Sequence, residues 1–565
     1  MRLFCMCILF CTIMSNLLHL YLDDNNFLFV DDIMRSMAAF PSLRFLSLDY
    51  SFNKGGILFA NEVPDLPYLE VLALRNNDLN GTLPMEAFAS FHHLKVLDLS
   101  YNNFVGSIPS TIKLLSSLEV ISFDRNELNG SLPEDHGSFS FSLFSNHTRL
   151  KFFQFERDNE KFEVETEEPI GWIPLFQLKY LLLSNWNIKT AKGSVVPSFL
   201  LHQHDLRTLD LAHNSLEGQF PNWLLKNNKK LNRLVLRNDS FQGVIRDALY
   251  KNASIRWLDI SKNNMTGTIP EDIQKFIPNI EVLNFSSNAL NGVIPFSIRD
   301  LSELSTLDLS DNELSGEVPK AFFTNLSRFA VIKLSNNRLS GYVLSGNLSF
   351  SIQVLQLDNN NFIGDIGNNT NKDWHRAVLD ISNNHFTGEI PEELGMLTHI
   401  LFLNLSHNRL TGPIPVSFSN LAKIESLDLS SNRLSGNVPS QLVKLTYLEV
   451  FNVSHNNLSG RLPDWKAQFA TFTMESYEGN PLLCGLPLEN KCTTAPHVSD
   501  SSTNEGTHKW YDIDRASFYG SSGSTWFVFM LGFAAILYIN PYWRRWWLDF
   551  VEECMYICYY SFMIL

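Results

Sequence analysis

The chain has 565 residues, of which 45% are apolar and 18% are charged, and its formal net charge is −15. This composition is too apolar for a disordered chain, and an acidic chain without a basic block lacks the clustered Lys and Arg that nucleic-acid binding needs. Seven cysteines are too few for a scaffold built on disulfides.

Residues 1–15, MRLFCMCILFCTIMS, form an apolar N-terminus with a single arginine. We interpret this segment either as a weak signal peptide, although no cleavage site with small residues is evident, or as the truncated start of a longer chain. Both alternatives stay open at this point.

A repeated motif fills residues 16–463. Three copies read LSTLDLSDNELSGEVP at 304–319, ILFLNLSHNRLTGPIP at 400–415 and IESLDLSSNRLSGNVP at 424–439, which gives the template LxxLxLxxNxLxGxIP. We count about 18 copies with a spacing of about 24 residues, and the first begins at Leu17. A fixed period of this length is the signature of a solenoid.

Two stretches interrupt the repeat. Residues 49–62 hold a degenerate copy, and residues 134–205 hold two weak copies. Between these weak copies lies the acidic run EKFEVETEE at 160–168, which we interpret as a solvated loop.

Each part of the template has a structural role. The LxL segment predicts a short strand whose leucines point inward, and the asparagine amide can bond to the backbone of its own turn and of the neighbouring coil. Glycine and proline make the tight return. Because only stacked repeats can bury these leucines, we predict an α/β-type repeat solenoid with a parallel β-sheet on the concave face.

The segments after the repeats predict a cap and a membrane anchor. Residues 464–498 contain Cys484 and Cys492, and in an oxidising compartment we expect a disulfide between them that closes the C-terminal cap. A juxtamembrane linker at 499–519 precedes an apolar stretch at 520–539, which has about the 20 residues that one transmembrane helix needs. A buried core helix is the alternative. Residues 540–565 would be a short cytoplasmic tail, with no room for a catalytic domain.

The GxIP endings and four longer stretches carry a resemblance to a known family. These stretches are 197–228, 381–415, the segment FNVSHNNLSGRLPDW…CGLPLENKC at 451–492, and LYINPYWRRWWLDFVEE at 537–553. They resemble plant leucine-rich-repeat receptor-like proteins, which are cell-surface receptors without a kinase domain. The resemblance implies a plant-type leucine-rich-repeat superhelix followed by one transmembrane helix.

The same resemblance implies a function. It implies a single-pass type I protein of the plasma membrane with extracellular repeats, which contacts membrane lipid through its span. Such a protein binds an extracellular peptide, a microbial fragment or a partner ectodomain through its concave face. It signals through associated receptor kinases, namely an adaptor kinase and a co-receptor kinase, in defence or development.

The chain departs from the family pattern before the last four repeats. Many relatives carry a non-repeat island there, whereas Asn360 and Asn384 lie in consecutive copies, so the island is absent or reduced to residues 364–376. Recognition that depends on such an island is therefore in doubt. The sequence contains no paired carboxylates in a defined cleft, no phosphate-binding glycine loop and no metal-ligand spacing, so we expect no enzyme activity, no cofactor and no metal.

The outward residues of the strands differ between the two halves of the repeat array. In the C-terminal half the two residues before each asparagine are nearly uniform and small, whereas in the N-terminal half they vary and carry charge. An inner face with Arg, Tyr and Trp has the composition of a binding patch, and arginine suits carboxylate or sulfate groups. The candidate ligand-binding residues are Arg75, Tyr101, Arg125, Arg207, Arg233, Arg237, Arg256, Trp257 and Lys262.

Three alternatives remain open. The varied residues could be tolerated surface substitutions. The protein could instead be a leucine-rich-repeat inhibitor of microbial cell-wall-degrading enzymes, which would need no membrane span, or a truncated decoy receptor. On the resemblance, the uniform C-terminal repeats would suit a flat contact with a co-receptor ectodomain.

Glycosylation sequons are frequent, although asparagine and serine are also consensus residues of the repeat. Candidate glycosylation sites are Asn80, Asn129, Asn146, Asn238, Asn252, Asn264, Asn284, Asn325, Asn347, Asn368, Asn404, Asn452 and Asn457. None lies beyond the predicted span, which favours extracellular repeats.

Overall fold

The computed structural model divides into two units, Met1–Cys492 and Thr493–Leu565. The structure describes residues 16–25, 27, 29–52, 55–59, 63–128, 139–156, 163–166, 172–189, 196–318, 330–344, 352–367, 377–490 and 492. The predicted span at 520–539 and the sequons at Asn129, Asn325, Asn347 and Asn368 lie outside these residues. Within the described ranges, none of the helices has the length and apolar character needed to cross a membrane.

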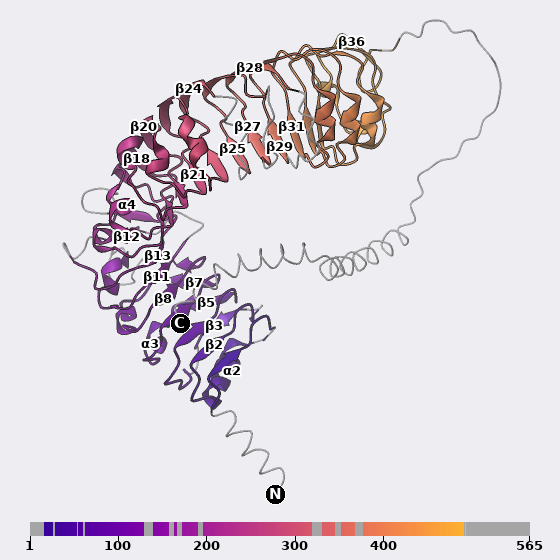
Figure 1. The fold of residues 1–565 in the computed structure, drawn as a ribbon. Coiled ribbons are helices and arrows are strands. Elements are labelled where there is room, and N and C mark those ends of the chain that lie inside the picture. Colours follow the sequence, from indigo (N-terminus) through magenta and orange to yellow (C-terminus); the bar gives the residue numbers. More distant parts are fainter. Residues whose placement is uncertain are drawn as a thin grey trace, which may run out of the picture. The chain divides into compact units, whose positions relative to one another are not determined.

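The LxL segments form one parallel sheet of 18 strands, which we call the inner sheet (Figure 1). Each strand pairs in register with the strand of the next coil, for example Leu72 of β4 with Leu97 of β6, so the predicted parallel-stranded solenoid is confirmed. The strands are β1 (His19–Tyr21), β2 (Phe45–Ser47), β4 (Val71–Ala73), β6 (Val96–Asp98), β8 (Val120–Ser122), β11 (Phe152–Gln154), β13 (Tyr180–Leu182), β15 (Thr208–Asp210), β17 (Arg233–Val235), β19 (Trp257–Asp259), β21 (Val282–Asn284), β23 (Thr306–Asp308), β25 (Val331–Lys333), β27 (Val354–Gln356), β29 (Val378–Asp380), β31 (Phe402–Asn404), β32 (Ser426–Asp428) and β34 (Val450–Asn452).

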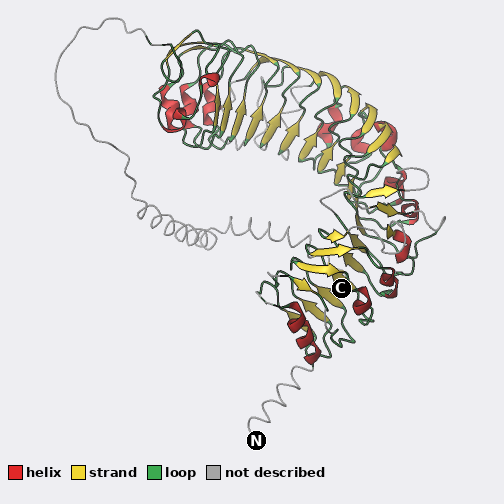
Figure 2. Ribbon diagram, turned by 180° about the vertical axis from the view of Figure 1, so that it is seen from behind, coloured by secondary structure: helices red, strands yellow, loops and turns green. Residues whose placement is uncertain are grey.

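A second series of short parallel strands follows the template asparagine, or the residue in its place, in most coils. Figure 2 shows both series of strands in yellow, running along the array from coil to coil. The second series consists of β3 (Gly56–Ile57), β5 (Leu79–Thr82), β7 (Asn103–Gly106), β9 (Glu127–Leu128), β10 (Phe139–Ser140), β12 (Glu163–Glu165), β14 (Asn187–Lys189), β16 (Glu217–Gln219), β18 (Ser240–Val244), β20 (Asn264–Thr268), β22 (Ala289–Gly292), β24 (Glu313–Glu317), β26 (Arg338–Gly341), β28 (Asn361–Asp365), β30 (His385–Thr387), β33 (Ser435–Gly436), β35 (Asn457–Arg461) and β36 (Leu482–Cys484). The interpretation of residues 160–168 as a loop is wrong in part, because β12 pairs with both β10 and β14.

Short helical segments complete the coils. The α-helices are α2 (Val30–Ser36), α3 (Met85–Phe88), α4 (Trp223–Asn227) and α5 (Ile245–Ala248), and the 3-10 segments are η1 (Met37–Ala39), η2 (Ser110–Leu114), η3 (Phe141–Phe144), η4 (Ser198–His202), η5 (Ile273–Lys275), η6 (Phe296–Asp300), η8 (Glu392–Met396), η9 (Val416–Asn420), η10 (Ser440–Lys444), η11 (Ala467–Ala470) and η12 (Met474–Ser476). Template leucines such as Leu258, Leu283 and Leu307 have no exposed surface and form one continuous core. Burying each leucine contributes about 1.5–3 kcal/mol.

The template asparagines form a buried ladder between neighbouring coils, as their position predicts. Asn263 is typical. Its Nδ2 donates to the carbonyl oxygens of Leu236 (2.7 Å) and Ile260 (3.0 Å), and its Oδ1 accepts from the Phe241 N–H (2.9 Å). Each rung thus satisfies backbone groups that would otherwise be buried without partners.

Where another residue replaces the asparagine, it donates to the same carbonyl of the preceding coil. The Ser51 hydroxyl donates to the Leu22 oxygen (2.6 Å), and the Trp186 indole N–H donates to the Phe155 oxygen (2.5 Å). Asp239 is the exception. One of its oxygens accepts from two backbone N–H groups, whereas Oδ2 is buried without a partner in the described part of the chain. Burial raises the pKa of Asp239 to about 7.

An aromatic cap covers the last coil. Phe451 of β34 contacts Phe469 of η11, Phe472 and Tyr477, with ring centroids between 5.1 and 5.9 Å apart. The structure joins Cys484 and Cys492 by a disulfide whose Cα atoms are 5.1 Å apart. The cap thus covers the C-terminal end of the leucine core.

Candidate functional site

Side chains on the inner sheet stack in columns because its strands pair in register. In the coil of β19, the residue before the strand is Arg256, the first strand residue is Trp257, the last is Asp259, and the turn before the ladder asparagine holds Ser261 and Lys262. We use the name pre-strand column for the residues that directly precede each strand.

The structure brings three of the predicted ligand-binding residues together in what we call the Arg–Tyr cluster. The guanidinium carbons of Arg75 and Arg125 lie 4.7 Å and 5.2 Å from the centroid of the Tyr101 ring. These residues follow β4, β6 and β8, which are neighbours in the sheet. Tyr101 has a φ of 55°, a left-handed conformation that is costly for a bulky residue.

Buried carboxyls lie beside this cluster. Asp49 accepts a hydrogen bond from the Arg75 N–H (2.7 Å), and burial, reinforced by the charge of Asp98, raises its pKa to about 7. Burial also raises the pKa of Asp124 to about 6, against the opposing effect of Arg125. The pKa of each carboxyl is therefore close to the pH of a mildly acidic medium, where protonation would remove part of the negative charge beside the two arginines.

A second group, the Arg–Trp pair, lies on β17 and β19. Arg233 and Trp257 are opposite each other in the sheet, and the Arg233 guanidinium carbon lies 4.0 Å from the Trp257 ring centroid. Arg256 instead pairs with Glu281 at 2.5 Å, so its charge is already compensated within the sheet. Arg237 and Lys262 are exposed in the turns that follow these strands.

Most of the predicted ligand-binding residues thus fall into two groups, one around the Arg–Tyr cluster and one around the Arg–Trp pair. Strands β11, β13 and β15 separate the two groups. Arg207 lies between them, directly before β15. The sequence analysis did not single out the buried carboxyls or Lys179, the neighbour of Arg207 in the pre-strand column. Aligning the coils column by column would have revealed both.

The C-terminal half of the inner sheet satisfies its own polar groups. In β23 the Oδ1 of Asp308 accepts from both the backbone N–H (3.1 Å) and the hydroxyl (2.6 Å) of Ser310. Asp380 and Ser382 repeat the arrangement at 3.0 Å and 2.7 Å. These side chains bond to the scaffold, whereas Glu425 and Glu449 are exposed directly before β32 and β34.

The candidate glycosylation sites occupy different environments. Asn80, Asn146, Asn264 and Asn457 are exposed outside the inner sheet, whereas Asn284, Asn404 and Asn452 are last residues of inner strands. Asn238 is exposed in a turn of the inner face, where its Nδ2 lies 2.8 Å from His213 Nδ1. Asn252 is only 2% exposed, and its Nδ2 donates to the Asn228 oxygen (2.9 Å). A glycan on Asn252 would have to break that bond.

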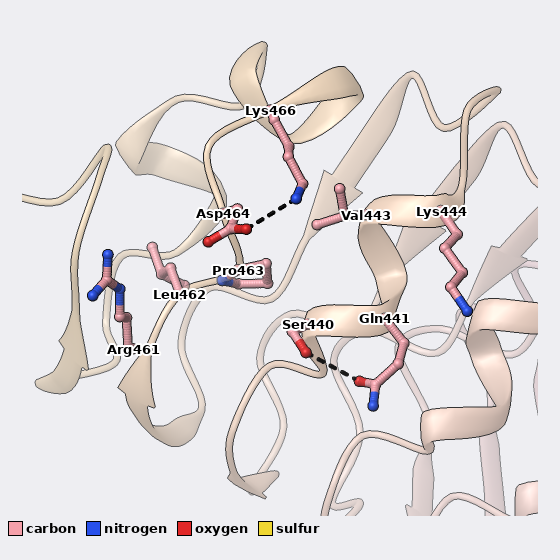
Figure 3. Close-up of a pocket in the computed structure, with 9 residues that line it drawn as sticks. All are labelled: Ser440, Gln441, Val443, Lys444, Arg461, Leu462, Pro463, Asp464 and Lys466. Carbon is pink, nitrogen blue, oxygen red and sulfur yellow. Dashed lines mark hydrogen bonds and ion pairs between the residues drawn. The ribbon is translucent and has the colours of Figure 1, made fainter. Parts of the chain in front are cut away.

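A hollow of about 470 Å³ lies near the C-terminal cap, between η10 and the residues after β35. Lys466 pairs with Asp464 at 3.0 Å. Figure 3 shows Arg461 and Lys444 at opposite ends of the hollow, so its cations do not converge on one point. The cations of the hollow therefore do not form one site at which a small anionic ligand could bind.

Comparison with known families identifies leucine-rich repeats along the chain. A leucine-rich-repeat profile matches residues 66–129 and 375–434, and a second one matches 205–227, 254–276, 279–301, 303–325 and 447–468. The Arg–Tyr cluster lies within the match at 66–129. Of the Arg–Trp pair, Trp257 lies within the match at 254–276, and Arg233 lies between the matches at 205–227 and 254–276.

Curated relatives are plant receptor-like proteins. The chain is 35% identical over 190 residues to Receptor-like protein 1 of Arabidopsis thaliana and 44% identical over 98 residues to Cuscuta receptor 1 of Solanum lycopersicum. The matched segments span 14% and 9% of the length of these two relatives. The resemblance to plant receptor-like proteins is confirmed.

Solved structures with the same fold are ectodomains of plant receptors. The chain is 26% identical to the plant peptide hormone receptor RGFR1 in complex with RGF2, with a TM-score of 0.57 over 80% of this chain and 69% of that one. It is also 26% identical to the Arabidopsis receptor kinase HAESA in complex with an IDA peptide hormone, with a TM-score of 0.60 over 82% of this chain and 81% of that one.

Proposed function

We propose that this chain, a leucine-rich-repeat protein homologous to plant receptor-like proteins, is a cell-surface receptor that binds an extracellular peptide on its inner sheet. The observation that carries the proposal is the pair of cation–aromatic groups on the N-terminal half of that sheet. Arginine stacked on Tyr or Trp is the composition of interaction hot spots. The peptide-bound complexes of RGFR1 and HAESA support a peptide over other ligands.

The proposal gives the C-terminal half a separate role. Its inner face is rich in small serine side chains and would suit a flat contact with the ectodomain of a co-receptor kinase. Signalling would then pass through an associated receptor kinase, with the chain held in the plasma membrane by the segment at 520–539.

A recruitment assay in plant cells tests this function. The full chain is expressed at the cell surface, the cells receive fractions of extracellular peptides, and association with receptor kinases is measured. We expect at least one fraction to promote association, and we expect the R75Q/R125Q and R233Q/W257A variants to lose about tenfold or more in sensitivity to it.

The matched control is K113Q/L114A on η2, which removes one exposed cationic and one exposed apolar side chain outside the inner sheet. This variant should respond to the fraction as the wild-type chain does. Equal responses of the wild type, R75Q/R125Q and R233Q/W257A would contradict binding at these two groups. Absence of association with every fraction would contradict the receptor function itself.

A further inference from the structure

The pre-strand column carries alternating charges over its first members. Arg44, Glu70, Lys95, Glu119 and Lys151 precede β2, β4, β6, β8 and β11. Glu70 pairs with Arg44 at 3.2 Å and with Lys95 at 2.5 Å, and Glu119 pairs with Lys151 at 2.5 Å. Opposite charges on neighbouring strands stabilise a sheet, whereas like charges opposite each other destabilise it.

The alternation breaks at Lys179. A carboxylate would continue the pattern there, but Lys179 follows Lys151, and Arg207 follows Lys179. Consecutive backbone hydrogen bonds hold the three residues side by side, from Lys179 N–H to the Lys151 oxygen and from Arg207 N–H to the Lys179 oxygen, both at 2.7 Å. Neighbouring strands lie about 4.8 Å apart, so the two side chains start close together.

No carboxylate in the described residues compensates this pair. Asp205, two residues before Arg207, is bound to Lys230 at 2.6 Å. Glu156 and Asp210 lie toward the opposite end of the same strands, where Asp210 accepts from the Ala212 N–H at 3.0 Å. Glu119, the nearest acid of the column, pairs with Lys151. Within the described part of the chain, two half-buried cations therefore stand on adjacent strands without an anion.

We infer that Lys179 and Arg207 form the anchor for a carboxylate of an acidic peptide, which restores the missing negative charge of the column. The inference rests on the proposed receptor function and specifies its ligand. Two cations on adjacent strands can bind the two oxygens of one carboxylate by charge-assisted hydrogen bonds. Such bonds are among the stronger ones at a surface.

The neighbouring column favours a peptide over an acidic polysaccharide. The first strand residues next to the anchor are Phe152, Tyr180, Thr208, Arg233 and Trp257, which pair in register from β11 to β19. Phe152 and Tyr180 have ring centroids 5.7 Å apart. A peptide that crosses these strands can place an acidic side chain on the anchor and an aromatic one against this row, whereas a polyuronate offers no apolar side chain to match it.

Binding of defined probes to the full chain tests the anchor. The probes are a short peptide of alternating Asp and Phe, its Asn and Phe counterpart, and an oligogalacturonate. We expect the acidic peptide to bind more tightly than the neutral one, and K179Q/R207Q to weaken it by about tenfold for each cation removed. The K95Q variant, which removes a paired cation from the same column, should change the affinity by less than about twofold.

A stability measurement on the unliganded chain gives a second readout. K179Q should raise the midpoint of thermal unfolding because it relieves like-charge repulsion, whereas K95Q should lower it because it breaks an ion pair. Equal affinity of both peptides, unchanged binding by K179Q/R207Q, or no binding of the acidic peptide to the wild type would overturn the anchor. Binding of the oligogalacturonate alone, dependent on Lys179, would assign it to a polysaccharide.

Failure of the anchor can be told apart from failure of the receptor function. If extracellular fractions recruit a kinase equally through the wild type and K179Q/R207Q, the receptor function stands and the anchor does not.

Discussion

The two halves of the inner sheet use the same fold in different ways. From β21 to β34, most Asp and Asn residues that end the strands are bonded to the serine two residues later, as Asp308 is to Ser310. In the N-terminal half the same bond joins Asp98 to Ser100 and Asp259 to Ser261. From β1 to β19, arginines stack on aromatic rings and several carboxyls are buried with raised pKa. Polar groups that bond within the scaffold stabilise it, whereas the stacked arginines and rings of the N-terminal half give its inner face the composition of a binding surface.

Local conformational cost differs between the halves at a few coils. The residue before each ladder position has a positive φ in both halves. In both halves this residue is often Asn, as at Asn76 and Asn383, which tolerates the left-handed region. Bulky or long side chains stand there only in the N-terminal half of the described chain, at Tyr50, Tyr101, Arg125 and Lys262. Side chains retained despite such a cost are candidates for function.

The largest expected effect comes from restoring the ladder at Asp239. Its folded-state pKa of about 7 lies above that of an unfolded aspartate. The protonated carboxyl thus stabilises the fold fully below about pH 4, and this contribution is lost as the pH rises through about 7. D239N should therefore stabilise the chain by an amount that grows with pH, on the order of 3 kcal/mol at alkaline pH. Thermal unfolding of both proteins across this range measures the difference.

The control is the opposite substitution, asparagine to aspartate, at a ladder position of the C-terminal half. Asn384 donates to the oxygens of Leu357 and Ile381, so N384D should place a carboxylate against carbonyl oxygens and lose stability as the pH rises. A difference between D239N and the wild type that stays constant with pH would show that Asp239 does not titrate in the folded chain.

The second effect concerns Tyr101. Y101S gives the turn the small residue typical of the C-terminal half and removes the ring that both arginines contact. A tyrosine at the centre of such a cluster is typical of a binding hot spot, so the concentration of extracellular fraction needed for kinase association should rise about tenfold.

The corresponding change at Ser431, S431A, tests whether the effect is specific to the N-terminal half. It should leave binding of the active fraction, measured without the kinase, unchanged, because Ser431 occupies the same turn position in the half that is proposed to contact the co-receptor. If Y101S and S431A reduced this binding equally, the two halves would not differ in ligand binding.

Most of the fold could be predicted from the sequence because each coil repeats the same local rules. The inward leucines and the ladder of asparagines follow from the template alone. The proposed ligand-binding surface was harder to predict, because its side-chain contacts join residues of different coils. The Arg256–Glu281 pair and the Lys179–Arg207 pair emerge only when coils are aligned by register, and the irregular region at 134–205 obscures that alignment. The raised pKa of Asp239 depends on the burial of its carboxyl, which cannot be read from the sequence.

A third, smaller effect adds the serine motif to one coil that lacks it and removes it from one coil that has it. Asp210 accepts from the Ala212 N–H but has no serine hydroxyl there, unlike Asp380 with Ser382. A212S should supply that bond and stabilise the chain by about 1 kcal/mol, and S382A should destabilise it by a similar amount. Chemical denaturation of the two variants measures the shifts. Negligible shifts in both variants would mean that the serine hydroxyl adds no stability to the motif.

The smallest expected effect tests the conformational cost in the N-terminal half. Lys262 has a φ of 54° and is exposed before the ladder residue Asn263. K262N replaces it with a residue that tolerates this conformation and should stabilise the chain by roughly 0.5–1 kcal/mol. The measurement is thermal unfolding, with S287N in the C-terminal half as the matched exchange at a position that is already small. If Lys262 is kept for binding, K262N should gain stability and lose sensitivity to the peptide fraction together. A gain in stability with full sensitivity would instead mark Lys262 as a tolerated surface residue.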